Sequence, residues 1–293
     1  MLSFNLYDLH SDLLTSSLTL RQKQNAIKKI KKQGNRSINA IYNENLSWNQ
    51  ASLLADEFSK NDDTLLAFEN CCYPDFNKHL FGSDFSSESK IKELANSLLK
   101  FNPLYLSLCW NNQNAFASGC ATSGGITGAG RKFIEQINGL GGILDTAHIN
   151  EQGFYELIDL GERVICSHTA FNFVFPHRRN ISEHQIRLIL QKGGIIGLVA
   201  VGHFLTGAKG SISAYENAFY EHIDGYLQKF GDNGLAIATD FYGSDAPVFL
   251  NGDYSFVGAI ANKLLSRGIS EVSVKNILYK NASEFFEKKL SKV

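Results

Sequence analysis

Short apolar runs alternate with longer segments of helical periodicity along the whole chain. The stripe Ile91, Leu94, Ala95, Leu98 and Leu99 has the spacing of a helix with one core-facing side. Ser182, three residues before Gln185, predicts a capping box at the start of another helix. The pattern predicts strands at residues 4–10, 36–42, 64–69, 103–110, 142–147, 163–167, 194–201 and 234–239. It predicts helices at residues 22–33, 49–60, 87–100, 128–139, 151–160, 182–192, 213–230, 254–267 and 271–290.

The predicted strands have the character of a parallel sheet. Residues 194–201 and 235–238 are hydrophobic without alternation, as in strands covered on both faces. Eight strand–helix units in 293 residues favour an α/β fold of the (β/α)8 TIM barrel type, with an open doubly wound α/β sheet as the alternative. No Gly/Pro/Ser-rich linker interrupts the pattern, so we expect a single domain over residues 1–293, with an extra C-terminal helix near 271–290 and a long loop at 111–127.

Composition excludes several classes of partner. The chain has 28 basic and 29 acidic residues, and it lacks the basic stretch that nucleic acid or an anionic membrane surface requires. Its apolar runs are too short to cross a bilayer and its start lacks the pattern of a signal peptide, so we expect a cytoplasmic protein. Five cysteines without C-x-x-C spacing predict small core residues in a reducing compartment rather than disulfides or a thiolate zinc site.

Potential metal ligands follow the ends of several predicted strands, which meet at one rim of a parallel barrel. They are His10, Asp12, Glu69, His148 and His168. Imidazole and carboxylate ligands without thiolates suit zinc in an open catalytic site. Two ions bridged by one carboxylate, for which Glu69 is the candidate, would use all five side chains. A lone His-x-Asp such as His10 and Asp12 is alternatively an ordinary polar pair.

Other polar residues suggest roles in proton transfer and substrate binding. Asp240 follows an apolar strand beside Phe241 and Tyr242, where a proton shuttle and a carboxylate that caps the next turn are both reasonable interpretations. An arginine of segment 177–180 suits a substrate carboxylate, and a solvated loop charge is the alternative. We expect His79, His184 and His222 at the surface, while His177 and His203 are candidates for the rim without an assigned role.

At these residues the sequence resembles the membrane (renal) dipeptidase family of zinc peptidases, including its soluble bacterial members. The segment Asp8-Leu9-His10-Ser11-Asp12-Leu13 looks like the family's Asp-Gly-His-Asn-Asp-Leu. Asp145-Thr146-Ala147-His148 resembles Asp-Leu-Ala/Ser-His, and Ser167-His168 resembles Ser-His-Ser. Thr239-Asp240-Phe241-Tyr242-Gly243 is similar to Gly-Asp-Phe-Asp-Gly, and Arg179 lies in a matching run. The match continues in order through nearly the whole chain.

The resemblance implies a metallo-dependent hydrolase-like (β/α)8 barrel with two Zn²⁺ ions that hydrolyses dipeptides and tolerates a D-residue at the carboxyl end. It implies that His10, Asp12 and bridging Glu69 hold one ion, and that Glu69, His148 and His168 hold the other. Asp240 would take a proton from the bridging water and pass it to the leaving amine. Arg179 would bind the terminal carboxylate of a small dipeptide substrate. A homodimer is left open.

The sequence departs from the family pattern in ways that affect substrate choice. Trp110, a candidate substrate-binding residue, stands where the family often has a histidine that steadies the oxyanion, and an indole has one N–H donor and no positive charge. Tyr242 replaces the second aspartate after Asp240, and Asn70-Cys71-Cys72 replaces the usual glycines. Two alternatives therefore remain: another metal-dependent amidohydrolase acting on a lactam, acylamino acid or cyclic amide, or a non-catalytic metal- or peptide-binding relative.

Overall fold

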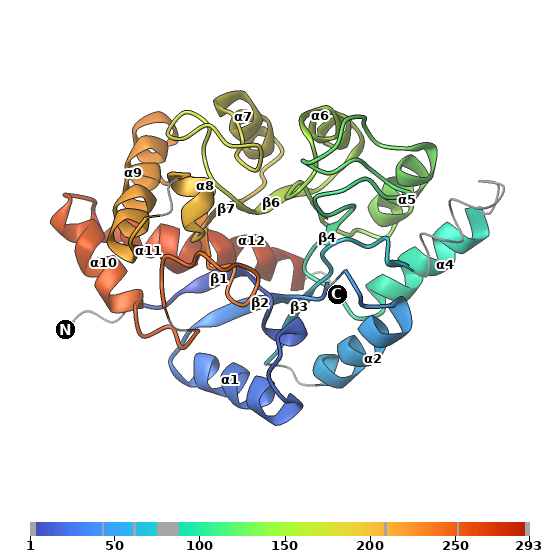
Figure 1. The fold of residues 1–293 in the computed structure, drawn as a ribbon, viewed down its shortest axis with the longest axis horizontal. Helices are drawn as coiled ribbons and strands as arrows, with labels where there is room; N and C mark the ends of the chain where they lie inside the picture. Colours follow the sequence, from blue (N-terminus) through green and yellow to red (C-terminus); the bar gives the residue numbers. More distant parts are fainter. Residues whose placement is uncertain are drawn as a thin grey trace. The chain divides into compact units, whose positions relative to one another are not determined.

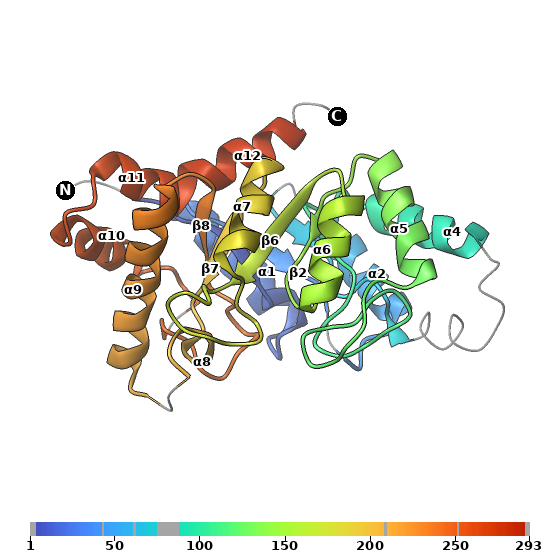
Figure 2. The ribbon, with the colours of Figure 1, turned by 90° about the horizontal axis from the view of Figure 1, so that it is seen from above.

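A computed structural model of the chain describes residues 4–42, 44–60, 63–74, 88–207, 210–250 and 252–290. The chain forms two compact units, one of Met1–Ile38 with Cys166–Val293 and the other of Asn39–Ile165. Strands β2 (Arg36–Ala40) and β6 (Val164–Thr169) each run through the boundary between the two stretches of sequence. Strands and helices alternate along the chain, as the sequence colours of Figures 1 and 2 show.

The described residues of the first unit contain three consecutive parallel pairings. Strand β1 (Tyr7–Ser11) pairs with β8 (Leu235–Ala238), β8 with β7 (Ile196–Val199), and β7 with β6. The start of β2 bonds beside β1 through Arg36 N and Leu6 O, 2.8 Å apart. All residues of β1, β7 and β8 are buried, as expected for strands without an exposed face.

The second unit contains the remaining pairings. Strand β4 (Leu106–Ser107) pairs with β5 (Leu144–Asp145), and β5 pairs with the start of β6, all in parallel. Strand β3 (Leu65–Ala67) neighbours β2, and a parallel bridge from Phe68 to Leu106 links the β3 and β4 segments. The strand order is β3-β2-β1-β8-β7-β6-β5-β4. Together with the β3–β4 bridge, this is the connectivity of a (β/α)8 barrel, so the predicted fold is confirmed and the open sheet is excluded.

Helices follow the strands in the predicted order. They are α1 (Leu20–Lys32), α2 (Trp48–Ser59), α4 (Glu88–Leu99), α5 (Gly128–Gly139), α6 (Glu151–Leu160), α7 (Glu183–Gln191), α8 (Gly202–Leu205), α9 (Ile212–Phe230), α10 (Val257–Ser266), α11 (Glu271–Lys275) and α12 (Asn281–Leu290). A 3-10 turn covers Leu13–Thr15, and a π turn over Asn276–Lys280 joins α11 to α12. The short helix α8 was not predicted. The 271–290 helix is present but carries the π turn within it.

Local sequence signals explain where these helices begin. The predicted capping box of Ser182 and Gln185 is present at α7, and equivalent boxes start α1 at Thr19 and α2 at Ser47. The stripe predicted on α4 is buried at Ile91, Leu94, Ala95 and Leu98. Segment 111–127 forms a loop with isolated bridges only, as predicted.

The predicted surface position of His222 is wrong. This residue of α9 is fully buried: its Nδ1 accepts a hydrogen bond from Phe171 N at 3.2 Å, and its Nε2 lies 3.1 Å from Leu205 O. Burial lowers the pKa of His222 to about 4. The histidine therefore acts as a neutral core residue, whereas His184 is exposed as predicted and His79 lies outside the described residues.

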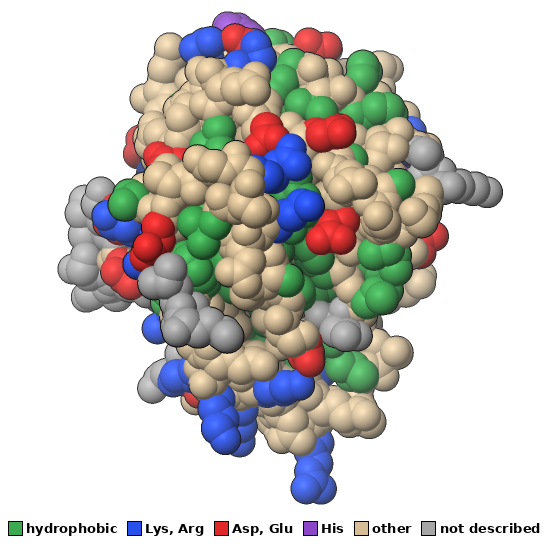
Figure 3. All heavy atoms as spheres, turned by 90° about the vertical axis from the view of Figure 1, so that its left-hand side faces the viewer, with side chains coloured by type: hydrophobic (Ala, Val, Ile, Leu, Met, Phe, Trp, Pro, Cys, Tyr) green, Lys and Arg blue, Asp and Glu red, His purple; other side chains and the backbone are tan. Residues whose placement is uncertain are grey.

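The surface carries charged side chains of both signs, as expected from the 28 basic and 29 acidic residues of the chain. Helices α9 and α10 lie side by side in Figures 1 and 2, and Arg267, just after α10, pairs with Asp224 of α9. Figure 3 shows acidic and basic side chains interspersed across the middle of the face that it presents, with several Lys and Arg side chains toward its lower edge. Four of the five cysteines are buried and all five are free thiols, as predicted. In the part of the chain that the structure describes, no helix has the length and apolar character that crossing a bilayer requires.

Candidate functional site

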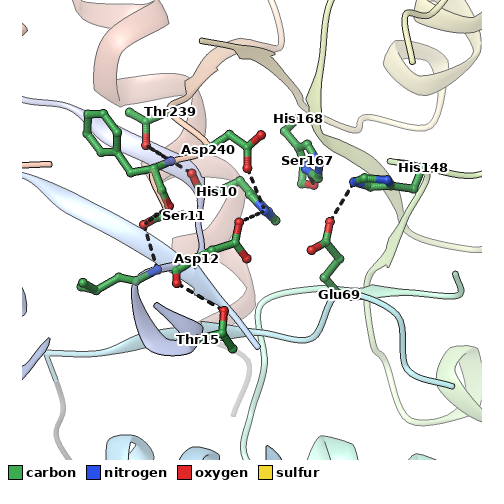
Figure 4. Close-up of polar contacts among 12 residues, drawn as sticks. His10, Ser11, Asp12, Thr15, Glu69, His148, Ser167, His168, Thr239 and Asp240 are labelled. Atoms are coloured by element: carbon green, nitrogen blue, oxygen red, sulfur yellow. Dashed lines mark hydrogen bonds and ion pairs between the residues drawn. The ribbon is translucent and has the colours of Figure 1, made fainter. Parts of the chain in front are cut away.

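Three potential ligands of the first unit converge where β1 and β8 end. The side chains of His10, Asp12 and Asp240 point toward one another in Figure 4, and each offers a ligand atom within 4.8 Å of the other two. His10 Nε2 lies 3.5 Å from Asp12 Oδ2 and 3.8 Å from Asp240 Oδ1. His10 is 1% exposed and Asp12 8%. One buried imidazole, one buried carboxylate and one partly exposed carboxylate at this spacing fit a divalent cation.

His168, in β6, lies against His10. The two ring centroids are 3.9 Å apart, and His168 is buried. Ser167 Oγ is 2.8 Å from Nδ1 of His168. Because this contact occupies Nδ1, Nε2 is the nitrogen of His168 that can serve as a ligand.

Gly243 provides the space between two of the carboxylates. A Cβ atom at this position would overlap Asp12 Oδ2 and Asp240 Oδ1. The backbone after β8 can therefore approach the two acids only because residue 243 has no side chain.

Asp8 is a buried carboxylate to which the sequence assigned no role. Its Oδ1 accepts hydrogen bonds from the backbone N–H groups of His10 and Thr239, at 3.2 and 2.8 Å. It is fully buried, and burial raises its pKa to about 6 against the opposing effect of its hydrogen bonds. Asp8 thus holds the backbone next to two of the clustered side chains. Its position two residues before His10 was the only signal in the sequence.

Glu69 and His148 form a buried pair in the second unit. Glu69 follows β3 and His148 follows β5, and Glu69 Oε1 lies 2.9 Å from His148 Nε2. Figure 4 shows the two side chains directed at each other. Nδ1 of His148 lies 2.8 Å from Oδ1 of Asn111, a residue that sequence reasoning missed. The nitrogen of His148 that faces Glu69 is therefore the one available for a metal.

Asp145 supports the backbone before His148 as Asp8 supports that before His10. Its Oδ1 accepts from Ala147 N at 3.0 Å and its Oδ2 from Ser107 Oγ at 2.8 Å. Asp145 is buried. Each unit thus has an acid that organises the end of a ligand-bearing strand without belonging to the predicted ligand set.

Trp110, in the second unit, packs near His148 and Tyr42. Its ring centroid is 5.7 Å from that of His148 and 5.9 Å from that of Tyr42, and both aromatic side chains are half-buried. Burial raises the pKa of Tyr42 to about 12, so its phenol remains protonated. Trp110 therefore places an indole ring next to His148.

Arg179 is buried in the first unit, whereas its neighbour Arg178 is exposed. The guanidinium lies 5.4 Å from the ring centroid of Phe204 in α8, and Nη2 donates to His168 O at 3.4 Å. No hydrogen-bond acceptor within the described ranges reaches its Nε. A buried cation with a free donor is suited to an anionic ligand. The interpretation of Arg179 as a solvated loop charge is therefore excluded.

The two predicted rim histidines differ in environment. The ring of His177 stacks on Phe204 at 5.0 Å, and burial together with Arg179 lowers its pKa. His203 is half-exposed, and its Nε2 lies 3.8 Å from Asp245 Oδ1. His177 therefore contributes to the surroundings of Arg179, and His203 has a surface ion pair.

Two of the predicted site residues have unusual backbone conformations. His148 has φ 68° and Asp240 has φ 54°, in the left-handed region that non-glycine residues rarely adopt. Such conformations cost on the order of 1–3 kcal/mol and are concentrated at functional sites. The sequence gives no signal for either.

Comparison with known proteins identifies similar sequences. A model of the family described as "membrane dipeptidase (peptidase family M19)" matches residues 82–291. A dipeptidase of the fungus Claviceps purpurea is 28% identical over 158 residues, which are 54% of this chain and 37% of that protein. The match therefore spans well under half of the fungal dipeptidase.

Solved structures with the same fold cover nearly the whole chain. A dipeptidase of family M19 matches with a TM-score of 0.72 and 18% identity, over 98% of both chains. A metallopeptidase of Rhodobacter sphaeroides, bound to a phosphinate mimic of the dipeptide L-Ala-D-Ala, matches with a TM-score of 0.73 and 18% identity, over 97% of this chain and 99% of that one. At this identity the likeness establishes the fold.

Proposed function

Because the chain belongs to the membrane dipeptidase family, peptidase family M19, we propose that it is a zinc-dependent dipeptidase. The observation that carries the proposal is the cluster of buried His10 and Asp12 with the partly exposed Asp240 at the ends of β1 and β8. Active sites of (β/α)8 barrels lie at this end of the strands. The activity is hydrolysis of the peptide bond of a dipeptide.

The proposed metal centre has two ions. His10, Asp12 and Glu69 hold one, and Glu69, His148 and His168 hold the other. Three observations support this set: the five side chains are buried, they are imidazoles and carboxylates, and each follows or ends a parallel strand. The Nδ1 contacts of His148 and His168 leave Nε2 of both residues for coordination. Bound zinc ions supply Lewis acidity, which polarises the scissile carbonyl and lowers the pKa of water.

Asp240 is the proposed proton carrier. Its carboxylate is partly exposed, with 11% of the side chain accessible, so it can reach both a water molecule and a substrate. It takes the proton of the attacking water and later gives it to the leaving amine. Asp240 N donates to His10 O at 3.0 Å, which fixes the start of this side chain relative to β1.

Arg179 and Trp110 are the proposed substrate-binding residues. The free Nε donor of Arg179 pairs with the terminal carboxylate of the dipeptide. Trp110 presents an aromatic ring beside His148. The Rhodobacter relative binds a mimic of L-Ala-D-Ala, which supports including L,D dipeptides among the substrates. Five free cysteines suit a cytoplasmic location.

A second candidate is another amidohydrolase activity on the same metal centre. Trp110 favours it, because an indole supplies one neutral N–H and no positive charge for a developing oxyanion. Tyr242 also favours it, since this half-exposed phenol follows Asp240 where the family has an aspartate. Acylamino acids, lactams and cyclic amides are the substrates of this alternative.

Elemental analysis and a substrate panel test the proposal together. Purified protein should contain two zinc ions per chain, and His148→Ala should reduce that number toward one. The panel comprises L,L dipeptides, L,D dipeptides and acylamino acids. Hydrolysis of dipeptides that is lost on chelation and restored by Zn²⁺ supports the proposal. Hydrolysis of acylamino acids alone supports the second candidate, and metal binding with no hydrolysis leaves a binding protein.

A further inference from the structure

Tyr254 completes a buried hydrogen-bond network behind the His10, Asp12 and Asp240 cluster. It lies between β8 and α10, is 3% exposed, and donates its hydroxyl hydrogen to Asp8 Oδ2 at 2.5 Å. The Ser37 hydroxyl lies 2.9 Å from the same phenol oxygen. Neither the sequence pattern nor the proposed function assigned a role to Tyr254.

The partners of Asp8 connect this network to two strand ends. Oδ1 accepts from the N–H groups of His10 and Thr239, and Oδ2 accepts from the Thr239 hydroxyl at 2.6 Å as well as from Tyr254. One carboxylate therefore binds four donors, two of them on the backbone that precedes or bears a site residue. A buried acid with this many donors has a fixed orientation.

The backbone around Asp240 is held from both sides by the same group of residues. Asp240 N donates to His10 O at 3.0 Å, and Phe241 N donates to the Thr239 hydroxyl at 3.3 Å. The ring of Phe241 packs edge-on against Tyr254 with centroids 5.6 Å apart. Tyr254 thus contacts the segment of Asp240 through its ring and the segment of His10 through Asp8.

The backbone of Tyr254 has an unfavourable conformation, which indicates that the contacts around this residue hold it in place. Its φ of 61° lies in the left-handed region, which a bulky side chain adopts at a cost of on the order of 1–3 kcal/mol. The ring also stacks on Phe256 at 5.8 Å. These contacts maintain a backbone geometry that brings the hydroxyl to Asp8.

We propose that Tyr254 is a positioning residue, which acts through Asp8 to set the relative placement of His10 and Asp240. This inference rests on the proposed function for its kinetic consequence only. The mechanism is that the phenol fixes the orientation of the Asp8 carboxylate, and the carboxylate fixes the two backbone N–H groups. Outer partners of metal ligands typically change metal affinity or activity about 10- to 100-fold when they are lost.

The test compares Tyr254→Phe with Tyr226→Phe. Tyr226 is a matched control in the same unit, because it is fully buried and donates its hydroxyl hydrogen to a backbone carbonyl, Asn233 O, at 2.7 Å. Zn²⁺ titration by calorimetry, amide hydrogen exchange and dipeptide kinetics are measured on the full chain. Tyr254→Phe should lower Zn²⁺ affinity and kcat about 10- to 100-fold with a small change in KM, and speed exchange at His10 and Thr239. Tyr226→Phe should leave Zn²⁺ affinity, kcat and the exchange at His10 and Thr239 unchanged.

Unchanged Zn²⁺ affinity and unchanged exchange in Tyr254→Phe would overturn the inference. If Tyr254→Phe does not fold, Thr239→Ser and Thr239→Val decide it, since only serine keeps the hydroxyl that donates to Asp8. Serine should retain Zn²⁺ affinity and valine should lose it, while equal affinities contradict the network's role. A wild-type protein that binds zinc but cleaves no dipeptide refutes the proposed function alone, because the zinc and exchange measurements need no substrate.

Discussion

Nδ1 of His148 lies 2.8 Å from Oδ1 of Asn111, and Nε2 of the same ring lies 2.9 Å from Glu69 Oε1. An amide oxygen only accepts, so the Nδ1 atom carries the hydrogen in the neutral ring. The lone pair is then on Nε2, which faces the carboxylate. Asn111 therefore selects the tautomer of His148 that can bind a metal ion.

Replacement of Asn111 by alanine should lower Zn²⁺ affinity about 10- to 100-fold, because His148 loses the partner that fixes its tautomer. Calorimetric titration with Zn²⁺ measures the change. Asn112→Ala is the control, since the neighbouring asparagine is exposed and, among the described residues, accepts a hydrogen bond from Gly119 N through its backbone carbonyl. Equal affinities of the two variants would show that Asn111 does not act on the ligand.

Asp240→Asn should lower kcat roughly 100-fold or more while leaving Zn²⁺ content and KM close to those of the wild type. The amide keeps the shape of the side chain but cannot accept a proton. Steady-state kinetics with metal analysis on the same sample checks this. Near-normal turnover would rule out the proton-transfer role.

Gly243→Ala should disrupt the first-unit cluster, because the added Cβ would overlap the carboxylate oxygens of Asp12 and Asp240. Gly258→Ala in α10 is the matched control, since a Cβ there meets no atom within 4 Å. We expect Gly243→Ala to have a lower zinc content and a kcat lowered roughly tenfold or more, as is typical when the surroundings of metal ligands are disturbed. The Gly258 variant should be as active as the wild type and no less stable. Full zinc content in Gly243→Ala would contradict the steric argument.

Arg179→Lys should raise KM roughly 100-fold for dipeptides with a free carboxylate, because lysine lacks the Nε donor that is proposed to pair with that carboxylate. Dipeptide amides lack that carboxylate, so their hydrolysis should change little. Arg178→Lys serves as the control at the exposed neighbouring position. If both substrate types lose activity equally in Arg179→Lys, the residue does not recognise the terminal carboxylate.

The buried His222 should make the protein less stable in acid. Its pKa falls from 6.5 to about 4 on folding, so the unfolded chain binds the proton more readily between these values. The stabilising contribution is complete above pH 6.5 and is lost as the pH falls toward 4. The loss amounts to about 3 kcal/mol at 1.36 kcal/mol per pKa unit.

Urea unfolding of His222→Gln and of the wild type, at pH 7 and pH 4.5, measures this contribution. Glutamine does not titrate, so the variant should lose less stability on acidification than the wild type. Asp8, whose pKa burial raises, titrates with the opposite sign in both proteins and cancels in the comparison. His184→Gln, at an exposed position, should behave as the wild type. If the free energy of unfolding of His222→Gln and of the wild type falls equally between pH 7 and pH 4.5, His222 does not make the expected contribution.

Hydrophobic patterning was sufficient to predict the order of strands and helices, because buried parallel strands and amphipathic helices have distinct periods. It overestimated strand length: β4 and β5 have two residues each. Beyond those residues, loop hydrogen bonds such as Ala147 N to Asp145 Oδ1 replace the ladder. The residues after strands 4 and 5 are where Trp110 and His148 lie, so irregular backbone accompanies the candidate site.

Residue type and strand ends together were sufficient to nominate potential ligands but not their supporting partners. Asp8 and Asn111 act through contacts with residues that tertiary structure brings near, and Tyr254 contacts Asp8 across 246 positions of sequence. His222 was different, because a signal was present. It lies in register with the buried Tyr215, Phe219 and Tyr226 of α9, and helical periodicity alone indicated burial there. The left-handed backbone of His148 and Asp240 had no such signal.

The hydrogen bond from Tyr254 to Asp8 also constrains when the protein can acquire its active form during synthesis. The first strand leaves the ribosome with its buried acid long before residue 254 exists, since the two partners are 246 residues apart. Contacts of such high sequence separation form late in folding. A nascent chain that lacks the last strand and the segment after it therefore has no complete partner set for Asp8, and the surroundings of the proposed zinc site at the β1 end are complete only after most of the chain is translated.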